Sequence, residues 1–377
     1  MSMQRTAILV YSDDGIGLAS AGIEIVETGP RASCSGRTIA VDERTRSKQL
    51  NACVRRGRAL FTTRSLRALV SLCALVGLAA VIGAPTASAQ PGVGPEPLSL
   101  ERMGTPPDGA NDFSCKPSEA HPRPVILVHG TDTDMQESWP KLSPELAGQG
   151  YCVFALNYGA MPVMWDHSRL VWGIDDIEQS AHELGQFVDL VLSSTGASQV
   201  DLVGHSQGGT VSRQYLKFNG GADASDASRS KVNQVITLGA TNHGTSFNGL
   251  QQLYLLAASF GLPRDLTSQL VFGIAGTQQL IGSPLLKKLN AGSEVMPGVE
   301  YTVIATRKDE VVTPPERTFL NDGGTGQVKN EWVQDICPGN TASHMGMTRD
   351  PDVFYLISRA LDPTYPDSHP LACAPQS

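Results

Sequence analysis

The chain has 377 residues and a formal net charge of −8, and 41% of its residues are hydrophobic. This length suits one large domain or two ordinary ones. The charge is uneven: residues 1–89 hold 11 basic and 6 acidic side chains, whereas residues 90–377 hold 18 and 31. The excess of acidic side chains in residues 90–377 argues against nucleic acid or an anionic membrane surface as an electrostatic partner of this segment.

Residues 54–89 have the pattern of a secretory signal peptide. The arginine-rich run VRRGRALFTTRSLR precedes seventeen uncharged residues, ALVSLCALVGLAAVIGA, and then a small-x-small sequence that ends at Ala89. This order predicts export and cleavage after Ala89. A membrane anchor is the alternative, but seventeen residues fall short of the about 20 that a spanning helix needs. We therefore expect a secreted protein with no stable membrane span after cleavage.

The segments on either side of the predicted signal peptide are poorly patterned. Residues 1–53 show no clear amphipathic element, and a signal peptide normally begins near the start of a chain. We interpret this segment as an over-called gene start, with translation from Val54, or as a disordered leader. Residues 90–120 are rich in Pro, Gly and Ser, which predicts an irregular strap before a domain over 121–377.

Four of the seven cysteines lie in the part of the chain expected to be exported. An even number in an exported chain favours disulfides, and four cysteines allow three pairings. We expect Cys115–Cys152 and Cys337–Cys373, because these pairs join sequence neighbours. No two of the four have C-x-x-C spacing, so the sequence predicts neither a metal site nor a cofactor.

From residue 124 onward, short apolar runs alternate with helical patterns. The runs predict strands at 124–130, 151–159, 200–204, 232–240, 301–307 and 328–336, and the patterns predict helices at 139–149, 174–196, 206–219 and 353–361. This alternation predicts an α/β domain whose mostly parallel sheet has helices on both faces. Residues 246–295 contain no clear strand and predict short helices, which we expect to form a helical cap over a site, with extra core as the alternative.

The stretch VDLVGHSQGG at 200–209 places Ser206 in a G-x-S-x-G motif. In this motif the serine occupies a sharp turn between a strand and a helix, and the flanking glycines avoid collisions. The turn holds the hydroxyl at the N-terminus of the helix, where negative charge is favoured. The apolar run before Ser206 and the helical pattern after it favour a nucleophile over a turn serine.

A serine nucleophile needs a base to take its proton, and with this motif the acid and the histidine follow the serine in that order. His344, in a loop between the last predicted strand and helix, is the expected base. His243 precedes any suitable acid, and His369 lies in a Pro-rich tail. Asp309, just after a predicted strand, is the expected orienting acid, with Glu310 as the neighbouring alternative.

An acyl-transfer intermediate carries an oxyanion that two backbone donors should stabilise. One expected donor is the N–H of Gln207, the residue after the serine. The other is the N–H of Thr131, in the loop after the first predicted strand. The neighbouring His129 and His205 receive no predicted chemical role.

Six segments carry a family likeness: PVILVHGT, GYCVFALNYG, DLVGHSQGG, ITLGATNHGT, YTVIATRKDEVVTP and SHMGM. Together, over about 124–360, they resemble secreted bacterial triacylglycerol lipases of the α/β-hydrolase fold, in particular actinobacterial class 2 lipases. The resemblance implies that Ser206, Asp309 and His344 are the catalytic triad and that Thr131 and Gln207 form the oxyanion hole. The smallest members lack a large cap, so the long 246–295 segment departs from them.

The expected function is hydrolysis of acylglycerol esters at a lipid–water interface, by a monomer. A short-chain esterase or polyester depolymerase would use the same triad with a different acyl pocket. An acyltransferase would replace water by an alcohol in the deacylation step. A non-catalytic surface binding protein would have no need of all three triad residues.

Overall fold

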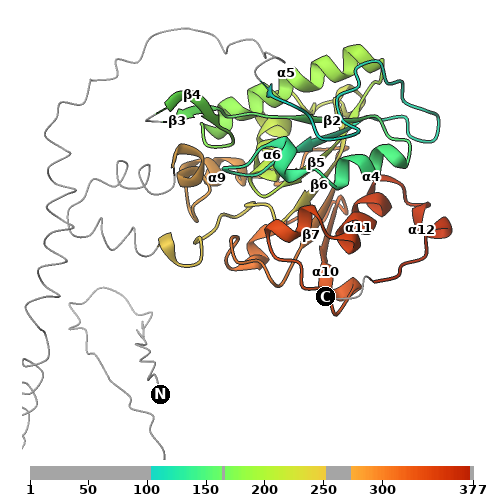
Figure 1. The fold of residues 1–377 in the computed structure, drawn as a ribbon. Helices are drawn as coiled ribbons and strands as arrows, with labels where there is room; N and C mark the ends of the chain where they lie inside the picture. The colour runs from blue at the N-terminus through green and yellow to red at the C-terminus, as the bar shows by residue number, and fades with distance from the viewer. Residues whose placement is uncertain (1–102, 164–165, 252–272, 374–377) are drawn as a thin grey trace, which may run out of the picture. The chain divides into compact units, whose positions relative to one another are not determined.

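The computed structural model describes residues 103–163, 166–251 and 273–373, all within one compact unit, Pro91–Ser377 (Figure 1). The predicted leader and signal peptide, the first part of the strap and residues 252–272 of the predicted cap lie outside the described residues. Within the described ranges, no helix is long and apolar enough to cross a membrane.

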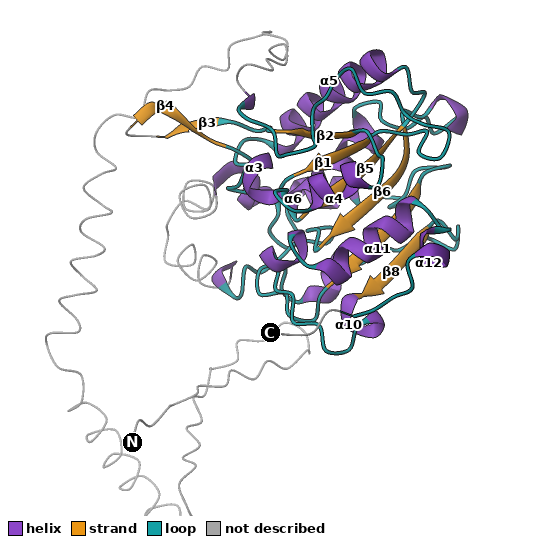
Figure 2. Cartoon of the chain, turned by 45° about the vertical axis from the view of Figure 1, so that its right-hand side comes forward, coloured by secondary structure: helices purple, strands orange, loops and turns teal. Residues whose placement is uncertain are grey.

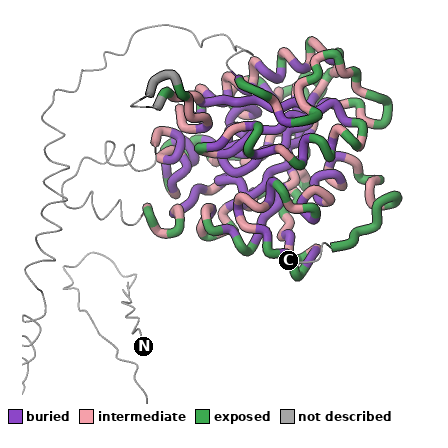
Figure 3. Tube along the Cα trace, viewed as in Figure 1, coloured by how far each residue is buried: buried purple, intermediate pink, exposed green. Residues whose placement is uncertain are grey.

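Six parallel strands form the central sheet, in the order β2-β1-β5-β6-β7-β8. Every side chain of β1 and β5 is buried. Successive side chains of a strand point to opposite faces, so both faces of the sheet are covered, and Figure 3 shows these strands as the buried centre. The strands are β1 (Val125–Val128), β2 (Val153–Leu156), β5 (Val200–His205), β6 (Val232–Leu238), β7 (Glu300–Ala305) and β8 (Val328–Trp332).

The main helices pack directly on this sheet. α5 (Ile177–Thr195) contacts α6 (Gln207–Phe218), and α6 contacts β1, β5 and β6. α4 (Leu142–Gly148) contacts β2, while α11 (Pro351–Leu361) contacts β7 and crosses in front of the sheet in Figure 2. This parallel sheet with helical cover, and a serine turn after β5, is the α/β-hydrolase fold. Shorter turns of helix are α3 (Met135–Ser138), α9 (Pro284–Leu289), α10 (Val333–Ile336), α12 (Tyr365–Ser368), η3 (Ala227–Arg229), η4 (Pro315–Thr318) and η5 (Met345–Thr348).

Helix α5 illustrates how local sequence sets an element. The Asp176 side chain caps its start by accepting from the N–H groups of Glu178 and Gln179. Gly196, with φ 79°, ends it in the left-handed region that favours glycine. The predicted helix at 174–196 is therefore confirmed, with its start moved to the residue after the cap.

Two parts of the chain differ from the predicted elements. An antiparallel hairpin of β3 (Met161–Val163) and β4 (Asp166–Val171) precedes α5, and its strands are too short and irregular to be recognised from alternation. The predicted strand at 328–336 is wrong in its last four residues, which form α10. Val333 and Ile336 lie at the three-residue spacing of a helix, and Val333 is buried.

The described end of the 246–295 segment belongs to the core. Residues 273–278 are helical, and α9 buries Leu285, Leu286 and Leu289 in the main hydrophobic cluster. The Ser283 side chain caps α9 by accepting from Leu286 N–H. α9 is therefore part of the hydrophobic core.

The strap is fastened to the edge strand β2. Asn111 Nδ2 donates to the Ala155 carbonyl at 2.9 Å, and its Oδ1 accepts from Ala155 N–H at 2.8 Å. The Cys115–Cys152 disulfide joins the strap to the start of β2, and Cys337–Cys373 joins α10 to the C-terminal segment. Both pairings are those expected from the sequence.

Candidate active site

Ser206 occupies the sharp turn between β5 and α6, with φ 53° and ψ −122°. A residue other than glycine is strained in this region, and surrounding contacts hold it there: its N–H donates to the Leu238 carbonyl at 2.8 Å. Ser206 stands at the N-cap of α6, yet its side chain makes no capping hydrogen bond. The hydroxyl is therefore not used to satisfy the helix.

The two glycines of the motif are required by close backbone approaches. A Cβ on Gly204 would lie 2.6 Å from the backbone nitrogen of Gly209, at the start of α6. A Cβ on Gly208 would overlap the carbonyl oxygen of Val128, at the end of β1. Only hydrogen at both positions lets α6 begin directly above the two strands.

Asp309 and His344 form a buried hydrogen-bonded pair. Asp309 Oδ2 lies 2.9 Å from His344 Nδ1, and both side chains are 2% exposed. Asp309 Oδ1 accepts from the N–H groups of Val311 and Val312 at 2.9 and 2.7 Å, so the carboxylate cannot turn freely. An ionised carboxylate only accepts hydrogen bonds, so Nδ1 carries the proton and Nε2 of the neutral ring is left as the basic nitrogen.

Glu310, the alternative acid, holds the histidine loop instead of the ring. Its Oε2 accepts from the backbone N–H of His344 at 3.1 Å. On the other side of the loop, His205 Nε2 lies 3.0 Å from the carbonyl oxygen of His344. A carbonyl only accepts, so His205 donates from Nε2. Burial holds the pKa of His205 well below its usual range, which keeps this ring neutral.

The serine turn and the Asp309–His344 pair both lie against the carboxyl end of β6. Ser206 is bonded to Leu238 at the end of β6, and a Cβ on the next residue, Gly239, would lie 3.0 Å from Asp309 Oδ2 and 3.1 Å from His344 Nδ1. The other downstream histidines are engaged elsewhere. His243 Nε2 lies 2.9 Å from Glu294, and His369 stacks on Tyr365.

Thr131 and Gln207, the expected sources of the oxyanion donors, are directly linked. The Thr131 hydroxyl donates to Gln207 Oε1 at 2.9 Å, and a Cβ on the preceding Gly130 would lie 3.2 Å from Ser206 Cβ. Among the described residues, the backbone N–H groups of Thr131 and Gln207 have no hydrogen-bond acceptor. Two free N–H groups therefore flank the serine, as an oxyanion hole requires.

His129 packs beneath this loop. Its ring stacks on Tyr158 with centroids 4.3 Å apart, and its Nδ1 donates to the Gly130 carbonyl at 2.8 Å. Tyr158 in turn donates to the His129 carbonyl at 2.6 Å. Burial lowers the pKa of His129 to about 4, so the ring is neutral and supports the loop through packing.

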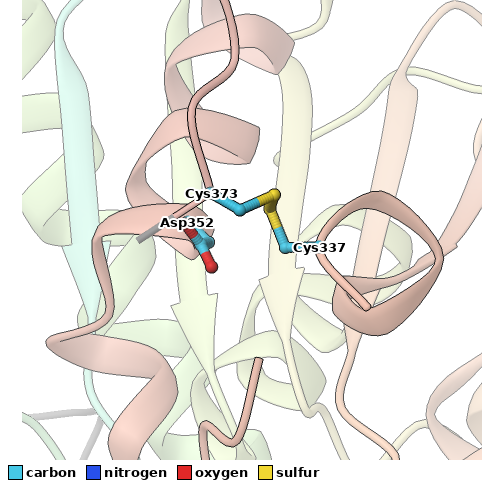
Figure 4. A group of neighbouring side chains, drawn as sticks. All are labelled: Cys337, Asp352 and Cys373. Carbon is cyan, nitrogen blue, oxygen red and sulfur yellow. A yellow bond between two sulfur atoms is a disulfide. The ribbon is translucent and has the colours of Figure 1, made fainter. Parts of the chain in front are cut away.

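Cys337, Asp352 and Cys373 lie close together near the C-terminus (Figure 4). Their spacing would suit a metal ion, but the two sulfur atoms are joined in a disulfide. A disulfide offers no thiolate to a metal, so this group is structural.

Comparison with known proteins identifies distant relatives. Triacylglycerol lipases of Pseudarthrobacter phenanthrenivorans and Burkholderia plantarii are each 29% identical over 144 residues, or 37% of this chain. The matches span only 39% and 35% of those relatives. Among solved structures, Aspergillus fumigatus lipase B has a TM-score of 0.47 at 19% identity, covering 68% of this chain and 55% of that one. Bacillus licheniformis lipase BlEst2 has a TM-score of 0.45 at 16% identity, covering 69% and 96%.

The family match spans more of the chain than the two sequence relatives do. The model of the family described as Lipase (class 2) matches residues 122–353, which make up more than half of the chain. The matched range includes the serine turn, the buried acid and histidine, and the loop with the free N–H groups. This chain belongs to the class 2 lipase family.

Proposed function

We propose that this protein hydrolyses carboxylic esters through an acyl intermediate on Ser206. The observation that carries this proposal is the buried hydrogen bond between Asp309 and His344 beside a strained serine turn. Asp309 fixes the tautomer that leaves His344 Nε2 basic, and it stabilises the imidazolium that forms when this nitrogen takes a proton.

In the acylation step, Ser206 Oγ bonds to the ester carbonyl carbon while His344 Nε2 takes the hydroxyl proton. The carbonyl electron pair moves onto the oxygen, which the backbone N–H groups of Thr131 and Gln207 stabilise. When the pair returns, the bond to the alcohol oxygen breaks, and His344 gives its proton to the leaving alcohol. Water then attacks the acyl carbon with the same proton transfers, releasing the carboxylic acid and Ser206.

We propose acylglycerols as the substrate class, which family membership and the names of the two curated relatives support. We also propose that the protein is secreted after cleavage at Ala89 and acts as a monomer. Export is consistent with the two disulfides, which form and persist in oxidising compartments.

The test compares the wild type, Ser206→Ala and the control Ser193→Ala, an exposed serine of α5. Turnover is measured with a soluble p-nitrophenyl ester and with emulsified triacylglycerols of increasing chain length. We expect Ser206→Ala alone to lose activity, with unchanged thermal unfolding. Substantial remaining turnover would place the nucleophile elsewhere. Activity only on short soluble esters would contradict the acylglycerol proposal and leave an esterase.

A further inference from the structure

A directional chain of hydrogen bonds links the two residues of the proposed oxyanion hole to Gln279. Gln279 Nε2 donates to Thr131 Oγ1 at 2.9 Å, and the Thr131 hydroxyl donates to Gln207 Oε1 at 2.9 Å. Gln207 Nε2 then donates to the Gly173 carbonyl at 3.1 Å. This series of hydrogen bonds connects loops that are far apart in sequence, since Gln279 and Thr131 are separated by 148 positions.

The direction of this chain is set by its two ends. Gln279 Nε2 also faces the Ala275 carbonyl at 3.1 Å, and a carbonyl only accepts, so the amide nitrogen must point there. At the other end, the Gly173 carbonyl fixes the amide of Gln207 in the same way. The Thr131 hydroxyl has one proton, which goes to Gln207 Oε1 because the amide nitrogen of Gln279 donates and cannot accept it.

Gln279 is itself held rigidly. Its side chain is buried, with the residue 1% exposed, and Oε1 accepts from the Thr241 hydroxyl at 3.0 Å. Thr241 is tied in turn to Thr210 of α6 at 2.8 Å. Both N–H groups of the Gln279 amide are therefore used and its oxygen accepts one hydrogen bond, so a side chain without an amide cannot replace it.

From this chain we propose that Gln279 is a positioning residue of the oxyanion hole. It acts through the Thr131 hydroxyl and keeps the backbone N–H groups of Thr131 and Gln207 at the separation that one oxygen atom requires. This inference rests on the proposed function. Misplaced donors weaken transition-state stabilisation more than substrate binding, so the loss should fall on kcat.

The test uses Gln279→Met and its neighbour Gln278→Met as a matched control. Gln278 bonds to Ile177 N–H and to the Asp176 carboxylate at the start of α5, away from the serine. With a soluble p-nitrophenyl ester, we expect Gln279→Met to lower kcat by about 10- to 100-fold, with KM within about threefold. Gln278→Met should retain kcat even if its thermal unfolding temperature falls as much as that of Gln279→Met.

A double-mutant cycle with Thr131→Val separates positioning from a general structural effect. Val removes the hydroxyl and keeps the backbone N–H, so Thr131→Val, Gln279→Met and the double variant should lose similar amounts of kcat. Thr131→Ser, which keeps the hydroxyl, should lose less kcat than Thr131→Val. If Gln279→Met does not fold, the Val and Ser variants at position 131 still decide the question.

Several results would overturn the proposal. The first is a kcat of Gln279→Met that stays within twofold of the wild type or falls no more than that of Gln278→Met. The second is a double variant in which the kcat losses of Thr131→Val and Gln279→Met multiply. The third is equal activity of Thr131→Val and Thr131→Ser. If the wild type is active and Ser206→Ala is not, such a result removes this inference alone. A wild type without ester turnover would remove the proposed function and this inference together.

Discussion

His205 Nε2 lies 3.0 Å from the carbonyl oxygen of His344 and is 139 positions away in sequence. The residue directly before the proposed nucleophile therefore holds the loop of the proposed base, and the two rings lie 4.7 Å apart. This contact couples the serine turn to the histidine loop, so the two cannot shift independently.

His205→Phe tests this coupling. Phenylalanine keeps an aromatic ring and removes the hydrogen bond, so we expect kcat to fall roughly tenfold, the equivalent of about 1.4 kcal/mol. His369→Phe, which alters a more exposed ring near the C-terminus, is the control and should retain kcat. Equal kcat values for His205→Phe and wild type would show that the contact does not position His344.

Asp309→Asn and Glu310→Gln distinguish the two neighbouring acids. Asparagine at 309 no longer holds His344 in the tautomer with a basic Nε2, so kcat should fall by at least about 100-fold. Glutamine at 310 can still accept from His344 N–H, so we expect a change of less than about threefold. Kinetics of the two purified variants check this, and the reverse order would assign the orienting role to Glu310.

Acid should destabilise the fold through His129. Burial lowers its pKa from the ordinary 6.5 to about 4, so below pH 6.5 the unfolded chain binds a proton that the folded chain does not. The contribution of His129 to the free energy of unfolding is therefore fully present above pH 6.5. It is lost as the pH falls toward 4, which lowers the free energy of unfolding by roughly 3 kcal/mol.

Urea unfolding of wild type and His129→Phe between pH 7.5 and 4.5 measures this contribution. Phenylalanine can stack on Tyr158 but cannot titrate, so the variant should lose less stability across the window. A parallel loss in both proteins would exclude His129 as the source. Because His205 is also buried and neutral, some loss of stability is expected to remain in the variant.

Asn111 should protect the free edge of β2. Its amide pairs with both backbone groups of Ala155, so Asn111→Ala leaves these edge groups without their partner, and an open edge promotes aggregation. We expect a thermal unfolding temperature lower by a few degrees and faster aggregation by light scattering. Asn321→Ala, which alters an exposed turn, should behave like wild type, and an unchanged Asn111→Ala would contradict this role.

The sequence allowed prediction of the features whose signals are local. The glycines around Ser206, the apolar run before it and the chain order of the acid and histidine were sufficient to indicate the serine turn and to select Asp309 and His344. The parallel sheet followed from near-continuous apolar strands. Each of these patterns spans a few residues and needs no knowledge of distant contacts.

The supporting residues could not be predicted because their roles depend on contacts across the fold. Gln278 and Gln279 are adjacent glutamines that the sequence does not distinguish. Only Gln279 bonds to Thr131, whereas Gln278 bonds to the start of α5. Glu310 and Asp309 are adjacent acids that bond to the backbone and the ring of the same histidine. Only the three-dimensional path of the chain distinguishes such neighbours.

Covalent labelling tests the central claim most directly. The protein is incubated with a fluorophosphonate, which reacts with an activated serine, and the modified peptide is identified by mass spectrometry. We predict one label per chain, on Ser206, and a strongly reduced labelling rate in His344→Ala. A label on another residue, or no label on a folded protein that hydrolyses esters, would contradict the assignment of Ser206 as the nucleophile.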